Sequence, residues 1–325
     1  ILSILSLLFF AGSLRASIGI TDLRVEQLKS PIGIDVRQPR LGWRIESDEQ
    51  NVMQTAYHIL VASSPELLAQ GKGDIWDSGK IESDASQWIT YQGKSLKRNT
   101  PYYWKVKAYT NKGEADWSAP ASWSMGLLNE ADWQGQWIGL DRAAPGDSET
   151  QWSRLAARYL RKEFALSKEV KRATIHIAGM GLYELFINGQ RIGNQVLAPA
   201  PTDYRKTILY NTYDVTSQLQ KENAIGVTLG NGRFYTMRQN YKPYKIPTFG
   251  YPKLRLNLII EYTDGSKETI STNTSWKLTT EGPIRSNNEY DGEEYDARKE
   301  LGNWTQSEYD DKNWICLLYT SDAAD

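Results

Sequence analysis

The acidic segment NNEYDGEEYDARKE, residues 287–300, gathers the side chains of this chain best suited to acid–base chemistry. Glycoside hydrolysis uses two carboxyl groups, one to protonate the leaving group and one to activate water or to attack. Adjacent residues of a strand face opposite sides, however, and solvated acidic loops are commoner than catalytic pairs. We therefore assign no catalytic residue in this segment. Its carboxylates are Glu289, Asp291, Glu293, Glu294, Asp296 and Glu300.

The many carboxylate oxygens of the same segment would also suit a calcium ion, although the order of acidic positions in an EF-hand is absent. No cofactor is required by any motif of the chain. The only histidines, His58 and His176, have no ligand partner at the spacing of a zinc site.

Two loops carry groups that suit the binding of sugars. Amides and carboxylates bridge neighbouring hydroxyls, and an aromatic ring packs against the apolar face of a sugar. One loop lies within residues 194–205 and the other begins GNGRFY at residue 230. The alternative for both is a polar rim that covers the end of a sandwich. The candidate carbohydrate-binding residues are Asn194, Asp203, Tyr204, Asn231, Arg233 and Tyr235.

The Gly-Asn-Gly sequence at residues 230–232 is not a phosphate loop, because no Lys-Ser/Thr pair and no long helix follow it. The chain of 325 residues holds 38 basic and 39 acidic side chains, a formal net charge of −1. A nucleic-acid partner, which needs a concentrated basic face, is therefore not expected. The single cysteine, Cys316, excludes a disulfide within the chain.

The two ends of the chain differ in character from the rest. Residues 1–16, ILSILSLLFFAGSLRA, are typical of a partial signal peptide and are too short to form a transmembrane segment. We therefore expect an exported protein, periplasmic or extracellular. Residues 315–325 resemble translated adapter sequence, and we interpret them as a sequencing artefact. A genuine C-terminal strand is the alternative.

The residues between these ends predict an all-β fold of two antiparallel β-sandwich domains. Short alternating segments separated by Gly, Asn, Asp and Ser fill residues 21–127. The step Pro101-Tyr102-Tyr103 enters a strand where a tyrosine hydroxyl is expected to bond back to the preceding corner. Trp104, Val106 and Ala108 are predicted to share one face of that strand. This first domain resembles a fibronectin type III-like sandwich, for which a spacer or packing role is the simpler interpretation.

The second domain is predicted over residues 151–314, after a linker at residues 128–150. Its strands, and the scarcity of long amphipathic helices, favour a jelly-roll-like sandwich. Asn188-Gly189 predicts a type I′ hairpin, because that turn needs positive φ at both central residues.

Four stretches of the chain resemble, in the same order, the N-terminal region of bacterial α-L-rhamnosidases of glycoside hydrolase family 78. They are ADWQGQWIGLD, GLYELFINGQRIGNQVLAPAPTDYRK, LYNTYDVTSQLQKENAIGVTLGNGRFY and EYDGEEYDARKE. Many relatives have Pro-Gly-Trp before Thr-Asp-Tyr, whereas this chain has Pro199-Ala200-Pro201, so a tryptophan suited to stacking is missing.

The resemblance implies a non-catalytic N-terminal fragment of a secreted enzyme that removes terminal L-rhamnose from glycans or glycosides. The family's inverting chemistry resides on an (α/α)₆ barrel, which would follow residue 314, and we expect this chain alone to be inactive. The implied partners are a rhamnose-containing carbohydrate and the catalytic domain of the same polypeptide. A stand-alone L-rhamnose-binding module is the alternative. In some relatives the second domain binds L-rhamnose with calcium.

Overall fold

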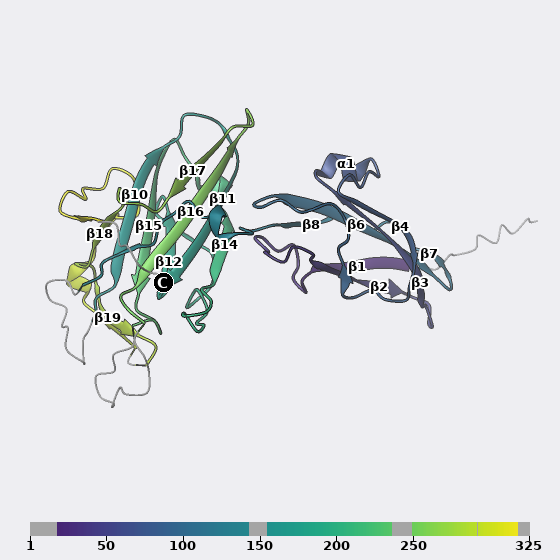
Figure 1. Ribbon diagram of the computed structural model, residues 1–325, viewed down its shortest axis with the longest axis horizontal. Coiled ribbons are helices and arrows are strands. Elements are labelled where there is room, and N and C mark those ends of the chain that lie inside the picture. Colours follow the sequence, from purple (N-terminus) through teal and green to yellow (C-terminus); the bar gives the residue numbers. More distant parts are fainter. Residues whose placement is uncertain (1–17, 143–154, 236–248, 291, 318–325) are drawn as a thin grey trace, which may run out of the picture. The chain divides into compact units, whose positions relative to one another are not determined.

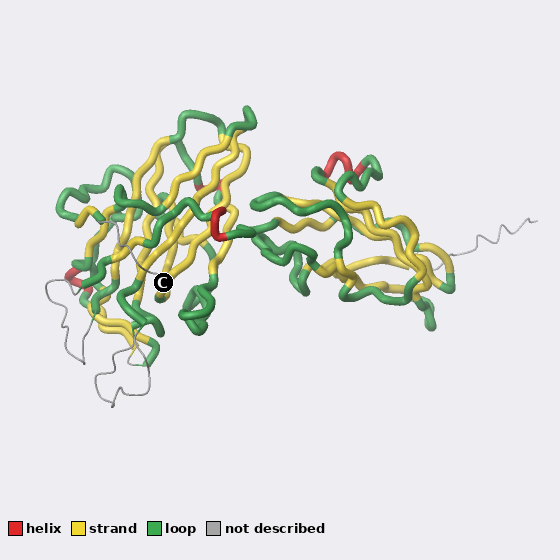
Figure 2. Tube along the Cα trace, viewed as in Figure 1, coloured by secondary structure: helices red, strands yellow, loops and turns green. Residues whose placement is uncertain are grey.

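The computed structural model describes residues 18–142, 155–235, 249–290 and 292–317 (Figure 1). The chain divides into two compact units, Ile1–Met125 and Gly126–Asp325. Strands make up nearly all of the regular structure, as Figure 2 shows, and the predicted all-β fold is confirmed. The segment predicted as a partial signal peptide lies outside the described residues.

The first unit contains a three-stranded sheet of order β1-β2-β5 and a five-stranded sheet of order β4-β3-β6-β7, in which β8 also pairs with β6. The short helix α1 (Pro65–Ala69) is capped at its N-terminus by Ser64, whose hydroxyl oxygen accepts a hydrogen bond from the backbone amide of Leu67. The strands are β1 (Ile18–Val25), β2 (Arg40–Ser47), β3 (Gln54–Ala62), β4 (Trp76–Glu82), β5 (Ile89–Thr90), β6 (Pro101–Thr110), β7 (Gly113–Glu114) and β8 (Ala121–Ser124).

Strand β6 has the alternation that its sequence predicts. Trp104, Val106 and Ala108 are fully buried on one face, while the residues between them are partly exposed. The backbone amide of Lys97 donates to Tyr102 Oη at 2.8 Å, which is the corner bond expected at the start of this strand. This bond fixes the entry of β6 into the first unit.

The second unit packs a six-stranded sheet of order β13-β12-β15-β10-β18-β21 against a five-stranded sheet of order β14-β11-β16-β17, with β9 added beside β16. Its core is aliphatic and includes Trp276. The strands of the first sheet are β10 (Arg158–Ala165), β12 (Leu182–Ile187), β13 (Gln190–Ile192), β15 (Glu222–Gly230), β18 (Lys277–Thr279) and β21 (Ile315–Cys316). Those of the second are β9 (Ile138–Gly139), β11 (Val170–Met180), β14 (Tyr210–Asp214), β16 (Lys253–Tyr262) and β17 (Lys267–Ser271).

The turn between β12 and β13 is the predicted hairpin. Asn188 and Gly189 have φ of 50° and 81°, and Ile187 pairs with Gln190 across the turn. Asn188 Nδ2 also donates to Gln218 O and to Asn223 Oδ1, each at 2.9 Å. The asparagine therefore provides the turn geometry and ties the turn to Gln218, before β15, and to the start of β15 itself.

The C-terminal part of the second unit covers the outer face of the six-stranded sheet. A Cβ atom on Gly226 of β15 would lie 2.6 Å from Thr305 Cγ2, so the bare glycine lets this segment lie directly on the strand. Trp304 and Trp314 form a small cluster there with Tyr159 of β10. A separate hairpin, β19 (Ile284–Asn288) with β20 (Gly292–Tyr295), stands beside this cluster.

Two segments at the predicted domain limits belong structurally to the second unit. The described part of the predicted linker contains a 3₁₀ turn, η1 (Glu130–Asp132), and β9, which pairs with β16. The amide of Gly135 donates to the buried Asn257 Oδ1 at 2.8 Å. At the other end, where the sequence prediction stopped at residue 314, β21 pairs with β18 and Leu317 is 3% exposed in the core. An apolar side chain that fills the core accounts for this extension.

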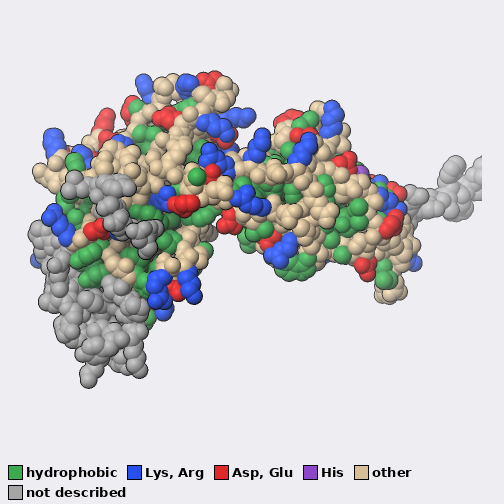
Figure 3. Space-filling model, viewed as in Figure 1, with side chains coloured by type: hydrophobic (Ala, Val, Ile, Leu, Met, Phe, Trp, Pro, Cys, Tyr) green, Lys and Arg blue, Asp and Glu red, His purple; other side chains and the backbone are tan. Residues whose placement is uncertain are grey.

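On the face drawn in Figure 3, basic and acidic side chains are interspersed over both units. Ion pairs such as Lys107–Glu114 and Arg172–Glu261 join opposite charges on neighbouring strands. Within the part of the chain that the structure describes, no helix has the length and apolar character needed to span a membrane.

Candidate functional site

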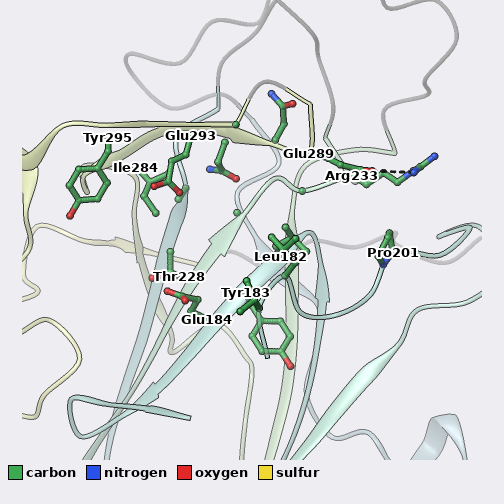
Figure 4. Close-up of a pocket in the computed structure, with 18 of the residues that line it drawn as sticks. Leu182, Tyr183, Glu184, Pro201, Thr228, Arg233, Ile284, Glu289, Glu293 and Tyr295 are labelled. Atoms are coloured by element: carbon green, nitrogen blue, oxygen red, sulfur yellow. Dashed lines mark hydrogen bonds and ion pairs between the residues drawn. The ribbon is translucent and has the colours of Figure 1, made fainter. Parts of the chain in front are cut away.

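A cavity of about 710 Å³ opens on the outer face of the six-stranded sheet (Figure 4). Strands β12 and β15 form its floor, and its walls come from the loop that follows β13, from the turn after β15 and from hairpin β19–β20. Pockets that bind small ligands have volumes of roughly 300–1,000 Å³. The cavity is therefore large enough to hold more than a single sugar ring.

The floor of the cavity is a pair of neighbouring strands. Glu184 of β12 lies opposite Thr228 of β15, and Leu182 lies opposite Gly230. Figure 4 shows the Glu184 and Thr228 side chains next to one another. Since alternate residues of a strand share a face, the intervening Tyr183 packs its ring into the core. The sheet thus presents a carboxylate, a hydroxyl and an apolar side chain.

An arginine from the short strand β13 fixes the carboxylate of the floor. Arg191 Nε donates to Glu184 Oε1 at 3.1 Å, and Arg191 Nη2 donates to Gln195 O at 2.8 Å. The guanidinium therefore connects the floor to the start of the loop that forms one wall. Exposed apolar side chains of that loop, Val196 and Leu197, line the cavity.

Hairpin β19–β20 forms the opposite wall. Asn287 lies across from Glu293 and Ile284 across from Tyr295, and all four line the cavity. Glu294 lies across from Ser286, outside the cavity lining. Burial, and after it the nearby Glu184 carboxylate, raise the pKa of Glu293. The two carboxylates therefore influence one another across the cavity.

The far end of the cavity is polar at its surface and aromatic beneath. Arg233 Nη1 is 3.3 Å from Glu289 Oε1, and Figure 4 shows this pair at the end away from Tyr295. Tyr204 packs edge-on against Phe234, with ring centroids 5.1 Å apart. Burial is the main cause that raises the pKa of Tyr204.

The structure brings two of the six predicted sugar-binding residues, Tyr204 and Arg233, into the cavity lining. Asn194 is exposed and lies outside the lining. Asp203 forms an ion pair with Arg205 at 2.9 Å, which lowers the pKa of Asp203.

Asn231 and Tyr235 serve packing rather than the cavity surface. Asn231 is 2% exposed, its amide donates to Asn287 Oδ1 at 2.6 Å, and its Nδ2 donates to Leu155 O at 2.8 Å. Tyr235 is buried and stacks on Tyr251. Asn231 therefore holds hairpin β19–β20 against the end of β15.

Sequence reasoning did not single out Glu184, Thr228 or Asn287 as site residues. The alternation in YELFI places Glu184 on the outer face of its strand, but nothing local to that strand reveals the hairpin that stands above it. Glu289 and Glu293 were considered as catalytic carboxylates and as oxygen ligands of calcium, not as sugar-binding residues, and Asp291 lies outside the described residues. In the described ranges, no three His, Cys, Asp or Glu side chains form a group that could hold a metal ion.

Comparisons with known proteins agree on one group of enzymes. The sequence profile of the α-L-rhamnosidase N-terminal domain matches residues 168–321, and that of the Rha78A-like N-terminal immunoglobulin domain matches residues 20–129. An α-L-rhamnosidase of Formosa agariphila is 39% identical over 93% of this chain, which covers 34% of that protein. An α-L-rhamnosidase of Alteromonas sp. is 35% identical over 92% of this chain, which covers 33% of that protein.

A solved structure shows the same similarity in three dimensions. The α-L-rhamnosidase from Dictyoglumus thermophilum superposes with a TM-score of 0.84 and 39% identity, over 93% of this chain and 34% of that one. The chain thus spans about a third of the length of the relatives that it matches.

Proposed function

The chain belongs to the α-L-rhamnosidase family, of which it contains the non-catalytic N-terminal region, and we propose that the whole protein hydrolyses terminal α-L-rhamnosides. The observation that carries this proposal is the 39% identity to a named α-L-rhamnosidase along 93% of the chain. Both sandwiches take part in that match, because the two family profiles together cover residues 20–129 and 168–321.

The catalytic step belongs to the part of the polypeptide that this chain does not include. The relatives are about three times as long as the matched region, and the described residues here form sandwiches rather than a helical barrel. The function of this region is to support the catalytic domain. Export of the whole protein, suggested by residues 1–16, is part of the same proposal.

Hydrolysis assays on two proteins test this proposal. The 325-residue chain and a longer polypeptide, read from the source DNA through the following domains, are each incubated with an aryl α-L-rhamnoside. The longer protein should release the aryl group and the chain alone should not, and an aryl β-D-glucoside should be left intact by both. Turnover by the chain alone that Glu294→Gln abolishes would overturn the assignment of catalysis to the missing part.

A second function, the binding of carbohydrate without catalysis, is favoured by the cavity on the second unit. Of the six residues predicted for sugar binding, Tyr204 and Arg233 are at the cavity, so the proposal rests on these two. Calorimetric titration of the chain with L-rhamnose, with and without calcium, tests it. Heat of binding that Arg233→Ala removes would support the module, and no heat at any concentration reached would refute it.

A further inference from the structure

At the end away from Arg233, the cavity between β12, β15 and hairpin β19–β20 carries a group of polar side chains. Glu184 and Thr228 lie side by side on the floor (Figure 4). On the wall, Glu293 lies opposite Asn287 across the hairpin. Leu182, Ile284 and Tyr295 add apolar surface around these groups. Convergent polar groups on an apolar lining are what a binding site needs in order to orient a ligand.

The charges of the cavity favour an uncharged ligand. Arg191 is paired with Glu184 and Arg233 with Glu289, so both cations of the lining are already neutralised. Glu293 has no ion-pair partner among the residues that the structure describes. An added carboxylate or sulfate group would meet this carboxylate without a cation to offset it. A hydroxyl group can donate to it.

Two lining residues also carry buried polar atoms that lack a hydrogen-bond partner within the described ranges. They are Oη of Tyr204, a residue only 9% exposed, and Nδ2 of Asn287. Buried polar groups are nearly always paired, because an unpaired one keeps the cost of losing its water. Both residues line the cavity, so the polar groups of its lining are not fully paired within the described chain.

We propose that this cavity binds an uncharged saccharide of more than one ring, whose neighbouring hydroxyls donate to Glu184 and Glu293. Thr228 contributes a further hydrogen bond from the floor, and Leu182 and Tyr295 pack against the apolar faces of the rings. The choice of a saccharide rests on the proposed function, whereas the preference for an uncharged one rests on the charges of the cavity. The site requires no metal ion.

Calorimetry on the 325-residue chain tests this inference with two matched probes, a rhamnose-containing disaccharide with a neutral second ring and its counterpart with a uronic acid. We expect the neutral probe to bind, equally in calcium and in EDTA, and the uronate to bind at least about tenfold more weakly. Glu293→Gln should weaken binding of the neutral probe about tenfold, as expected for loss of a hydrogen bond to a charged group. Thr228→Val should weaken it by a smaller factor.

Glu294→Gln is the matched control, because it makes the same chemical change one residue away and outside the lining. It should leave binding unchanged, and all variants should keep the melting temperature of the parent. The inference is overturned if neither probe binds, if the uronate binds better, if EDTA abolishes binding, or if Glu294→Gln and Glu293→Gln act alike. Its failure is separate from that of the proposed function, because hydrolysis by the longer protein is measured independently.

Discussion

Arg161 of β10 holds the C-terminal segment of the second unit on the sheet, and replacing it with methionine should detach that segment. Its side chain is 1% exposed. Nε donates to Trp304 O at 3.0 Å and Nη2 to Gln306 O at 2.9 Å. Nη1 pairs with Asp311, which Lys277 also contacts at 2.5 Å. Nη1 also donates to Tyr309 O and Nη2 to the more exposed Glu163, so one guanidinium contacts three backbone carbonyls and two carboxylates.

The size of the effect follows from these partners. Removing one member of a buried ion pair costs about 3–5 kcal/mol, because the other charge is left without compensation. Lys277 remains beside Asp311, so we expect a loss near the lower end, about 3 kcal/mol. For a domain of this size, each kcal/mol lowers the melting temperature by roughly 2–4 °C. The second unit of Arg161→Met should therefore melt about 6–12 °C lower than the parent.

Differential scanning calorimetry and hydrogen exchange measure the two consequences. The amides of Gly189 and Gln306, which donate to Thr305 O and Asn303 O, should exchange faster in Arg161→Met. The amide of Tyr91 in the first unit, bonded to Pro39 O, should be unaffected. Arg161→Lys keeps the charge but not the planar fork, so it should fall between the parent and Arg161→Met.

Arg298→Ala provides the control for the removal of an arginine, because Arg298 is 88% exposed in its pair with Asp296. It should leave the melting temperature unchanged. The reasoning is refuted if Arg161→Met costs less than about 1 kcal/mol, or if exchange accelerates uniformly over the second unit instead of around the C-terminal segment.

Three further predictions concern single residues. Burial lowers the pKa of His176 to about 4, so the unfolded chain takes up a proton near pH 6.5 before the folded one does, and stability should fall from pH 6.5 to about 4 and then level. His176→Asn should flatten this dependence in urea titrations at several pH values. Gly189→Val should destabilise the β12–β13 turn, because a β-branched residue is strained at a φ of 81°, whereas Asn188→Gly should be better tolerated in thermal melts. Tyr102→Phe should cost about 1 kcal/mol by removing the bond from the Lys97 amide, and an unchanged denaturation midpoint would contradict a stabilising role for that corner.

The local parts of the fold could be predicted because their signals lie in neighbouring residues. The alternation of Trp104, Val106 and Ala108, the corner at Tyr102 and the turn at Asn188-Gly189 all depend on side-chain direction or on the φ values of the residues themselves. The resemblance of four ordered stretches to α-L-rhamnosidases also depends on local sequence, and it correctly identified the chain as the N-terminal region of that family. Tyr204 and Arg233 were proposed because polar loops at the end of a sandwich often form sites; both line the cavity, and their role in sugar binding stays a prediction.

The cavity itself was decided by tertiary structure. Glu184, Thr228 and Glu293 are separated by at least 44 positions in sequence, and β15 brings the first two together by pairing with β12. Hairpin β19–β20 carries the third, and the amide of Asn231 after β15 donates to Asn287 of that hairpin. A strand's sequence determines which of its side chains face outward. Which other segment covers that face is set by pairing and packing between distant parts of the chain, and this information is not contained in any one stretch.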